Sequence, residues 1–285
     1  MKRKRPAPRP QAVVRAIVFC VLAAGLFLFW QFPPQEIAQR ESWEEFLVTA
    51  DIVKAERIGE GVTKPWRLYL KKGDTEHTAA WKDVESKSDG IADNWRHEIA
   101  AYRIDKLIGL NMIPVTVERE FKGKKGSLSL WAENKYSLLK ILEDGIEIPE
   151  AVLKQTDDMK YVVRYFDCLI ANDDRTQQNI RYTADWRTIL IDHSRAFQSS
   201  RKYTEKLIFG MKGIKETEEG KPFLIRRVPR VLFENVKALT LESIRRAVGP
   251  YLTDKESESV FARRKLVLDE IAEMIKQDGE AKVLY

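Results

Sequence analysis

The sequence is poor in cysteine and histidine. It holds two cysteines, Cys20 and Cys168, and three histidines in 285 residues. Cys20 lies in an apolar N-terminal run, so only Cys168 belongs to the rest of the chain. Two cysteines are too few for a disulfide framework or a cysteine-based zinc site. Only His193 lies near a group of acids, which disfavours a Ser-His-Asp hydrolase.

Several catalytic motifs are also missing. The chain contains no G-x-S-x-G and no G-x-x-x-x-G-K-[ST] sequence, which removes the usual signatures of α/β hydrolases and P-loop nucleotide-binding proteins. His97-Glu98 would need a histidine at position 101 to form a metalloprotease helix, and Ala101 stands there. The chain also has no internal repeat.

The body of the chain has no excess of basic charge. The formal net charge of +6 is matched by six basic residues near the N-terminus: Lys2, Arg3, Lys4, Arg5, Arg9 and Arg15. Without them the remaining lysines and arginines equal the aspartates and glutamates in number. A neutral domain offers no electrostatic footprint for a phosphate backbone, so nucleic acid is excluded as a partner.

The N-terminus predicts a membrane anchor. Residues 1–11 form a basic leader, and residues 12–32 form an apolar run that is long enough to span about 30 Å of hydrocarbon. A cleaved signal peptide is the alternative, but the only small-residue cluster, at 23–25, lies inside the apolar run. The positive-inside rule keeps the leader cytoplasmic. We therefore expect a single-pass protein whose residues 33–285 lie outside the cytoplasm.

The rest of the chain predicts an α+β protein with two lobes. Residues 33–56 are interpreted as a juxtamembrane linker with a short acidic helix, and residues 57–136 as a small β-rich lobe. Within that lobe we expect a hairpin at 65–85 with its turn at 72–74, a polar loop at 86–93, and strands at 112–120 and 126–133. One helix is expected at 93–109, capped at its start by Asp93 or Asn94 and at its end by Gly109. Residues 137–285 are predicted to form a larger, mostly helical lobe. Acids at the junction suggest a cleft between the lobes.

Three polar residues in the larger lobe predict a phosphoryl-transfer site. Asp174 and Asn179 lie five residues apart in a loop after an apolar helix, and Asp192 ends the strand-like run "RTILID". A hairpin of "NIRYT" and "TILID" would bring Asn179 beside Asp192. Amide and carboxylate oxygens are ligands that Mg²⁺ accepts, and Asp174 is placed to orient or deprotonate an attacking hydroxyl. An Asx-rich turn would explain Asp174 but not its joint spacing with Asp192.

These residues carry a resemblance to a known group of enzymes. "DRTQQN" followed by "IDHSRAF" resembles the catalytic and metal-binding loops of the atypical kinases. These include the phosphatidylinositol 3- and 4-kinases and the secretory-pathway kinases of the Golgi casein kinase type. The stretch "RHEIAAYRIDKLIGLNMIPVTVEREFKGKKGSLSLW" is similar to the helix and hinge strands of a bacterial kinase-like family. Two positions depart from the pattern: Thr176 replaces a histidine, and Ser194 replaces a glycine.

The resemblance implies a protein-kinase-like fold and further site residues. It identifies Lys82, in the strand-like "AAWKD", as the lysine that binds the nucleotide phosphates. Glu98 shares a helical face with two aromatic residues and is the expected partner of that lysine. Gly59 and Gly61 are candidates for a phosphate-covering turn, although a plain turn explains them equally well.

The function expected from these residues is transfer of the γ-phosphoryl group of ATP to a hydroxyl. The acceptor is a protein, a lipid or a glycan, and the cofactors are ATP with Mg²⁺ or Mn²⁺. A catalytically weak pseudokinase that binds nucleotide as a scaffold or sensor is the first alternative. A kinase-fold adenylyltransferase is the second.

Overall fold

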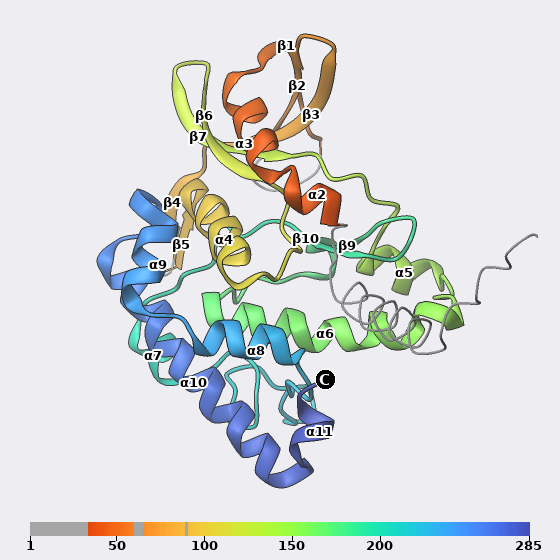
Figure 1. Cartoon of the computed structure of the whole chain (residues 1–285), viewed down its shortest axis with the longest axis vertical. Coiled ribbons are helices and arrows are strands. Elements are labelled where there is room, and N and C mark those ends of the chain that lie inside the picture. The colour runs from red at the N-terminus through yellow and green to blue at the C-terminus, as the bar shows by residue number, and fades with distance from the viewer. Residues whose placement is uncertain (1–33, 60–64, 89–90) are drawn as a thin grey trace, which may run out of the picture.

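The computed structural model describes residues 34–59, 65–88 and 91–285. The expected membrane anchor and Gly61 lie outside the described residues. Within the described part, no helix is both long and apolar enough to cross a membrane. Figure 1 shows two parts, a β-sheet with helices beside it and a larger helical part beneath it. The α+β, two-lobed architecture predicted from the sequence is confirmed.

The small lobe is built on a five-stranded antiparallel sheet in the order β1-β2-β3-β7-β6. Its strands are β1 (Asp51–Arg57), β2 (Trp66–Lys72), β3 (Thr75–Lys82), β6 (Thr116–Phe121) and β7 (Lys124–Leu130). The β2–β3 hairpin turns where we expected, at Gly73, whose φ of 58° suits a residue without a side chain. The β6–β7 hairpin also matches the prediction.

Helix α4 (Trp95–Ile108) is the helix expected in this lobe. The Asn94 side chain caps its start by accepting the N–H of Arg96, and Gly109 ends it in the left-handed conformation at φ 68°. Helix α4 is buried on more than one face, because Ile99, Tyr102 and Ile104 point in different directions around the helix and are all at most 1% exposed. The caps therefore fix where this helix begins and ends, and with it the position of Glu98.

The segment before the sheet contains the short acidic helix that we expected, and it also contributes a strand to the sheet that we did not expect. Residues 34–49 form helices α2 (Pro34–Ala38) and α3 (Arg40–Thr49), and β1 follows as an edge strand of the sheet. Helix α3 covers the sheet through Trp43, whose ring lies 5.2 Å from that of His77. Strand β1 is mostly exposed, so its sequence carries little alternation of apolar and polar residues.

The polar loop predicted at 86–93 contains a small two-stranded ribbon. Strands β4 (Glu85–Ser88) and β5 (Ile91–Asn94) pair antiparallel immediately before α4. Strand β4 consists of polar residues, and the apolar residues of β5 are Ile91 and Ala92. None of the side chains whose burial the structure describes is fully buried, so hydrophobic alternation gave no signal for these strands. The ribbon connects the end of β3, at Lys82, to the start of α4.

The large lobe begins after β7 and is mainly helical, as expected. Its elements are β8 (Tyr136–Ser137), α5 (Leu138–Asp144), α6 (Glu150–Ile170), η1 (Gln177–Asn179), β9 (Ile180–Tyr182), β10 (Thr188–Leu190), α7 (Arg201–Glu205), α8 (Arg230–Lys237), α9 (Leu241–Val248), η2 (Gly249–Tyr251), α10 (Asp254–Asp278) and α11 (Glu280–Val283). Figure 1 shows α6 crossing beneath the small lobe and α10 packing below α6. Buried apolar residues of both lobes form one continuous core.

Arg263 occupies a place that the sequence did not indicate. In the sequence, the stretch "VFARRKLVLDEI" predicts a late helix on which Arg263 and Arg264 form a solvated basic face. The Arg263 side chain is instead fully buried and donates to the carbonyl oxygens of Leu169 and Gln198, each at 2.9 Å. Burial lowers the pKa of its guanidinium to about 9. Arg263 thus joins α10 to the end of α6.

Candidate functional site

Lys82 and Glu98 meet where the two lobes face each other. The register of the sheet places Lys82 at the last position of β3, and α4 carries Glu98 in its first turn. The Lys82 Nζ lies 2.6 Å from Glu98 Oε1, and the two side chains are 16% and 6% exposed. The structure therefore forms the ion pair that the sequence led us to expect.

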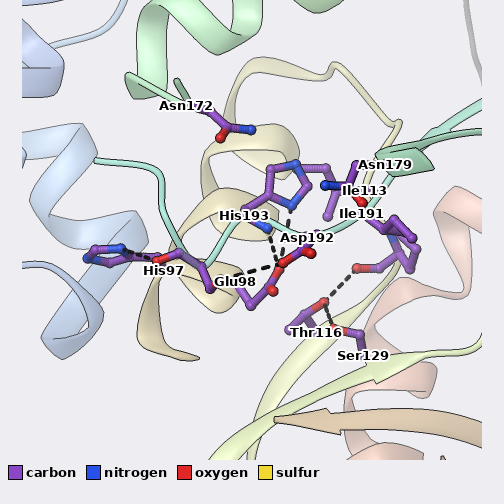
Figure 2. Close-up of polar contacts among 12 residues, drawn as sticks. His97, Glu98, Ile113, Thr116, Ser129, Asn172, Asn179, Ile191, Asp192 and His193 are labelled. Carbon is purple, nitrogen blue, oxygen red and sulfur yellow. Dashed lines mark hydrogen bonds and ion pairs between the residues drawn. The ribbon is translucent and has the colours of Figure 1, made fainter. Parts of the chain in front are cut away.

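The same lysine reaches the large lobe. Its Nζ lies 2.8 Å from Oδ1 of Asp192, in the loop after β10. Glu98 also reaches across, because its Oε2 accepts the backbone N–H of His193 at 2.9 Å. Figure 2 shows Glu98 next to Asp192 and His193. One lysine and one glutamate thus link β3, α4 and the loop of Asp192.

The side chains of Lys82, Glu98 and Asp192 stabilise one another in their charged forms. Burial would lower the pKa of Lys82, but the nearby Glu98 and Asp192 carboxylates outweigh it and raise that pKa above its usual range. Burial would raise the pKa of Glu98, but Lys82 and His193 outweigh it and hold that pKa below its usual range. Both groups are therefore charged at neutral pH.

Asn179 and Asp192 come together by the predicted hairpin. Strands β9 and β10 pair antiparallel, with Ile180 opposite Leu190. The hairpin continues one step further, because the N–H of Ile191 donates to the carbonyl oxygen of Asn179 at 3.1 Å. Figure 2 shows Asn179 beside Ile191, the residue before Asp192. The hairpin therefore places the backbone of Asn179 beside the residue that precedes Asp192.

Asp174 lies in the loop that leaves α6 and is accessible to solvent. Its side chain is 48% exposed, and its Oδ1 lies 3.3 Å from Nη1 of Arg195. From the sequence, packing beneath the loop of Asp192 is the default expectation for Arg195, but the structure places its guanidinium against the carboxylate of Asp174. The position of Arg195 three residues after Asp192 is the sequence signal that corresponds to this contact.

The loop that carries Asp192 has an unusual backbone. Asp192 itself adopts a left-handed conformation with φ 62°, as do Ala171 (48°) and Phe197 (61°) at the ends of the neighbouring segments. Such conformations in residues other than glycine cost energy and gather at functional sites. Ser194, which replaces a glycine of the family pattern, is not among the described residues with positive φ. The loop therefore does not need glycine at that position.

His193 is held inside the protein and is not placed to act on a substrate. Its side chain is 1% exposed, and its Nδ1 lies 3.6 Å from Glu98 Oε2. Burial and the nearby Arg175 cation lower the pKa of the imidazole, although Glu98 opposes them. A buried, neutral imidazole fits a packing role better than that of a base.

The predicted phosphate-covering turn is described only in part. Gly59 forms an exposed bend after β1, and a side chain built there would meet nothing within 4 Å. The N–H of Ile58 donates to Pro65 at 2.9 Å, which closes the connection between β1 and β2. The register pairs Trp66 of β2 with Trp81, next to Lys82. The turn therefore leaves the sheet at the same end as Lys82.

Comparison with known proteins supports the fold. No family model matches the sequence, and no curated protein matches it. Among solved structures the chain is similar to the proinflammatory kinase CtkA of Helicobacter pylori, with a TM-score of 0.51 and 11% sequence identity. The similarity covers 82% of this chain and 96% of that protein. At this identity the similarity establishes a kinase-like fold for the chain and nothing finer.

Proposed function

We propose that the chain is an ATP-dependent phosphotransferase of the atypical kinase type. The observation that carries the proposal is the position of Lys82, which contacts Glu98 of the small lobe and Asp192 of the large lobe. A lysine with this pair of acidic partners, at the end of a strand in a kinase-like fold, is suited to nucleotide phosphates. The sequence resemblance to lipid kinases and secretory-pathway kinases points in the same direction.

Each site residue then has a separate role. Lys82 would neutralise nucleotide phosphates while Glu98 keeps its ammonium in place. Asn179 and Asp192 would hold a divalent cation, and Asp174 would orient the acceptor hydroxyl or take its proton. ATP with Mg²⁺ or Mn²⁺ supplies the phosphoryl group and screens its charge. The acceptor is a hydroxyl of a protein, a lipid or a glycan.

The donor atoms fit such a cation only together with a nucleotide. The part of the chain that the structure describes has no group of three or more histidines, cysteines, aspartates or glutamates able to hold a metal ion by itself. Asn179 and Asp192 offer one amide oxygen and one carboxylate. Mg²⁺ characteristically takes one or two carboxylates and completes its shell with phosphates and water. The metal and the nucleotide should therefore bind together.

One experiment separates this proposal from its alternatives. The purified chain is incubated with Mg²⁺ or Mn²⁺ and with ATP labelled either at the γ-phosphate or at the α-phosphate. Transfer of the γ-label supports a kinase, and transfer of the α-label identifies an adenylyltransferase. If ATP binds but neither label moves, the chain is a pseudokinase. If millimolar ATP with either metal fails to bind, the kinase proposal is wrong.

The pseudokinase alternative has an observation in its favour. Both acids proposed for chemistry are engaged with cations, Asp174 with Arg195 at 3.3 Å and Asp192 with Lys82 at 2.8 Å. An active enzyme must exchange these partners for substrate and cation. Asp174 and Arg195 are both well exposed, and an exposed pair of this kind contributes at most about 1 kcal/mol. This pair is therefore too weak to prevent catalysis.

Membrane attachment is a separate proposal that rests on the sequence alone. Residues 12–32 would form the anchor, with the basic leader in the cytoplasm and the kinase-like domain on the other side. Helix α2 begins at Pro34, directly after that run. The domain would therefore be held close to the membrane surface.

A further inference from the structure

Arg175 contacts the backbone beside the residues proposed for the site. It follows Asp174 directly in the sequence. Its Nη1 donates to the carbonyl oxygen of Ile191, at 2.8 Å, immediately before Asp192. The same nitrogen lies 3.5 Å from the carbonyl oxygen of Asn179. One guanidinium therefore reaches the immediate neighbourhood of all three residues.

The other edge of this guanidinium is fixed to α6. Its Nε and Nη2 donate to the two carboxylate oxygens of Asp167, at 3.1 and 2.9 Å. The side chains of Arg175 and Asp167 are 4% and 0% exposed. A bidentate contact between a planar guanidinium and a carboxylate fixes orientation as well as distance. Arg175 is thus held rigidly by a helix of the core.

Asn172 extends the same network to the backbone of Asp174. Its Nδ2 donates to Oδ1 of Asp167 at 3.1 Å, and its Oδ1 accepts the N–H of Asp174 at 3.4 Å. Asn172 is fully buried, and Figure 2 shows it in the same region as Asn179, Asp192 and His193. Asp167 therefore sets the position of Asp174 through Asn172 and that of Ile191 through Arg175.

Arg175 cannot itself take part in chemistry at this site. A side chain that is 4% exposed, with each of its three nitrogens already donating, is not available to a substrate. It acts on the backbone of two separate loops, and these loops carry the residues proposed to meet substrate and cation.

We infer that Arg175 is a positioning residue that holds the loop of Asp174 and the loop of Asp192 in one fixed relation through Asp167. This inference rests on the proposed function for its effect on catalysis. The mechanical link between the two loops rests on the contacts alone. Without the link, each loop would keep its residues but would lose their common geometry.

The test uses Arg175→Lys in the full chain. Lysine keeps a positive charge opposite Asp167, so the buried carboxylate retains a countercharge. An ammonium group cannot donate the hydrogen bonds that the planar guanidinium makes to Asp167 and to the Ile191 carbonyl at the same time. Arg40→Lys is the matched control. Arg40 lies in α3 and pairs with Asp105 at 3.1 Å, with side chains 5% and 0% exposed. Both variants thus weaken a buried arginine–aspartate pair.

The first measurement is amide hydrogen exchange, which needs no substrate. In Arg175→Lys, the amides of 177–181 and 191–193 should exchange about tenfold faster or more than in the wild type, while the amides of β2 and β3 stay protected. Arg40→Lys should lower the melting temperature without this loop-specific change. Unchanged exchange in Arg175→Lys, or equal loop exchange in both variants, would overturn the inference.

The second measurement is turnover of γ-labelled ATP with Mg²⁺ or Mn²⁺, scored as transfer to the chain or to water. Misplacement of catalytic groups by about 1 Å can cost about 100-fold in rate, so kcat of Arg175→Lys should fall by this order. KM for ATP should change much less, because Lys82 is untouched. If the wild type shows no turnover, the proposed function fails, and the exchange experiment still decides the role of Arg175. A variant with wild-type kcat contradicts the positioning role.

Discussion

The ammonium of Lys82 in the small lobe lies 2.8 Å from the carboxylate of Asp192 in the large lobe. Because Lys82 also bonds to Glu98, the two lobes are connected by charge at the point where a nucleotide would bind. Asp192 therefore has two roles, because it pairs with Lys82 in this structure and is also the proposed ligand of a cation. Substitutions at these positions should therefore affect binding and stability together.

Lys82→Ala should weaken nucleotide binding and destabilise the domain. The substitution leaves Glu98 as a buried carboxylate without its main countercharge, which costs about 3 kcal/mol or more. Lys72→Ala is the control, because Lys72 forms an exposed pair with Glu45 that contributes little to stability. Urea unfolding and titration with ATP and Mg²⁺ measure the two effects. Equal behaviour of the two variants would mean that Lys82 is not the nucleotide lysine.

Asp192→Ala and Asp174→Ala should give different phenotypes. A ligand that binds only the folded state at 100 times its Kd stabilises it by about 2.7 kcal/mol, which raises the melting temperature by several degrees. Asp192→Ala should remove most of the metal-dependent part of this shift with ATP. Asp174→Ala should keep the shift and lose phosphoryl transfer, because its role is at the acceptor. Loss of the thermal shift in Asp174→Ala would contradict this division of roles.

The Lys82–Glu98 pair should contribute a constant stability across neutral pH. The pKa of Glu98 lies below its ordinary value of 4.5, so its contribution is complete above that pH and is lost as the pH falls toward the folded pKa. The pKa of Lys82 lies above 10.5, so its contribution is complete below that pH and is lost as the pH rises further. Thermal melts of the wild type and Glu98→Gln should differ by a constant amount above the range in which His193, which contacts Glu98, takes up a proton. A difference that varies between pH 7.5 and 9.5 would refute this account of the pair.

Asp105→Ala should be among the most destabilising single substitutions in the small lobe. Asp105 is fully buried, pairs with Arg40, and accepts the N–H groups of Met112 and Ile113 at 2.7 and 3.0 Å. Removing it leaves a buried cation and two amides without their partner, which costs about 3–5 kcal/mol. Urea unfolding checks the value, with Asp74→Ala in the exposed β2–β3 turn as control. A loss below about 1 kcal/mol would mean that water replaces the carboxylate.

The orientation of the chain in a membrane can be tested independently of catalysis. A reporter that is active only outside the cytoplasm, fused after Tyr285, should be active, because the six basic residues of the leader remain in the cytoplasm. A cytoplasmic reporter at the same position should be silent. The opposite pattern would reverse the topology and place the domain where ATP is abundant.

Local sequence signals predicted the parts of the fold that depend on neighbouring residues. The turn at Gly73, the caps at Asn94 and Gly109, and the β9–β10 hairpin all followed from short patterns. The edge strand β1 and the β4–β5 ribbon did not, because exposed strands show weak alternation.

Contacts between distant residues could not be predicted in the same way. The pairing of Lys82 with Glu98 followed from resemblance and helical spacing, whereas its contact with Asp192, 110 residues away, did not. The burial of Arg263 and the contact of Arg195 with Asp174 also depend on how separate segments pack. A basic side chain in a polar sequence carries no local sign that it will be buried.

The single apolar core that the two lobes share also determines how the molecule unfolds. Buried side chains of the sheet lobe, such as Leu68 and Met112, belong to the same cluster as Val162 and Leu190 of the helical lobe. A fragment that ends after β7 would expose the apolar surface that α6 and β10 now cover, and should aggregate rather than fold. The calorimetric and van't Hoff enthalpies of unfolding should therefore agree, as for one cooperative unit. Opening of the proposed nucleotide site must then be a small rotation within an intact core, since separating the lobes would amount to denaturing the protein.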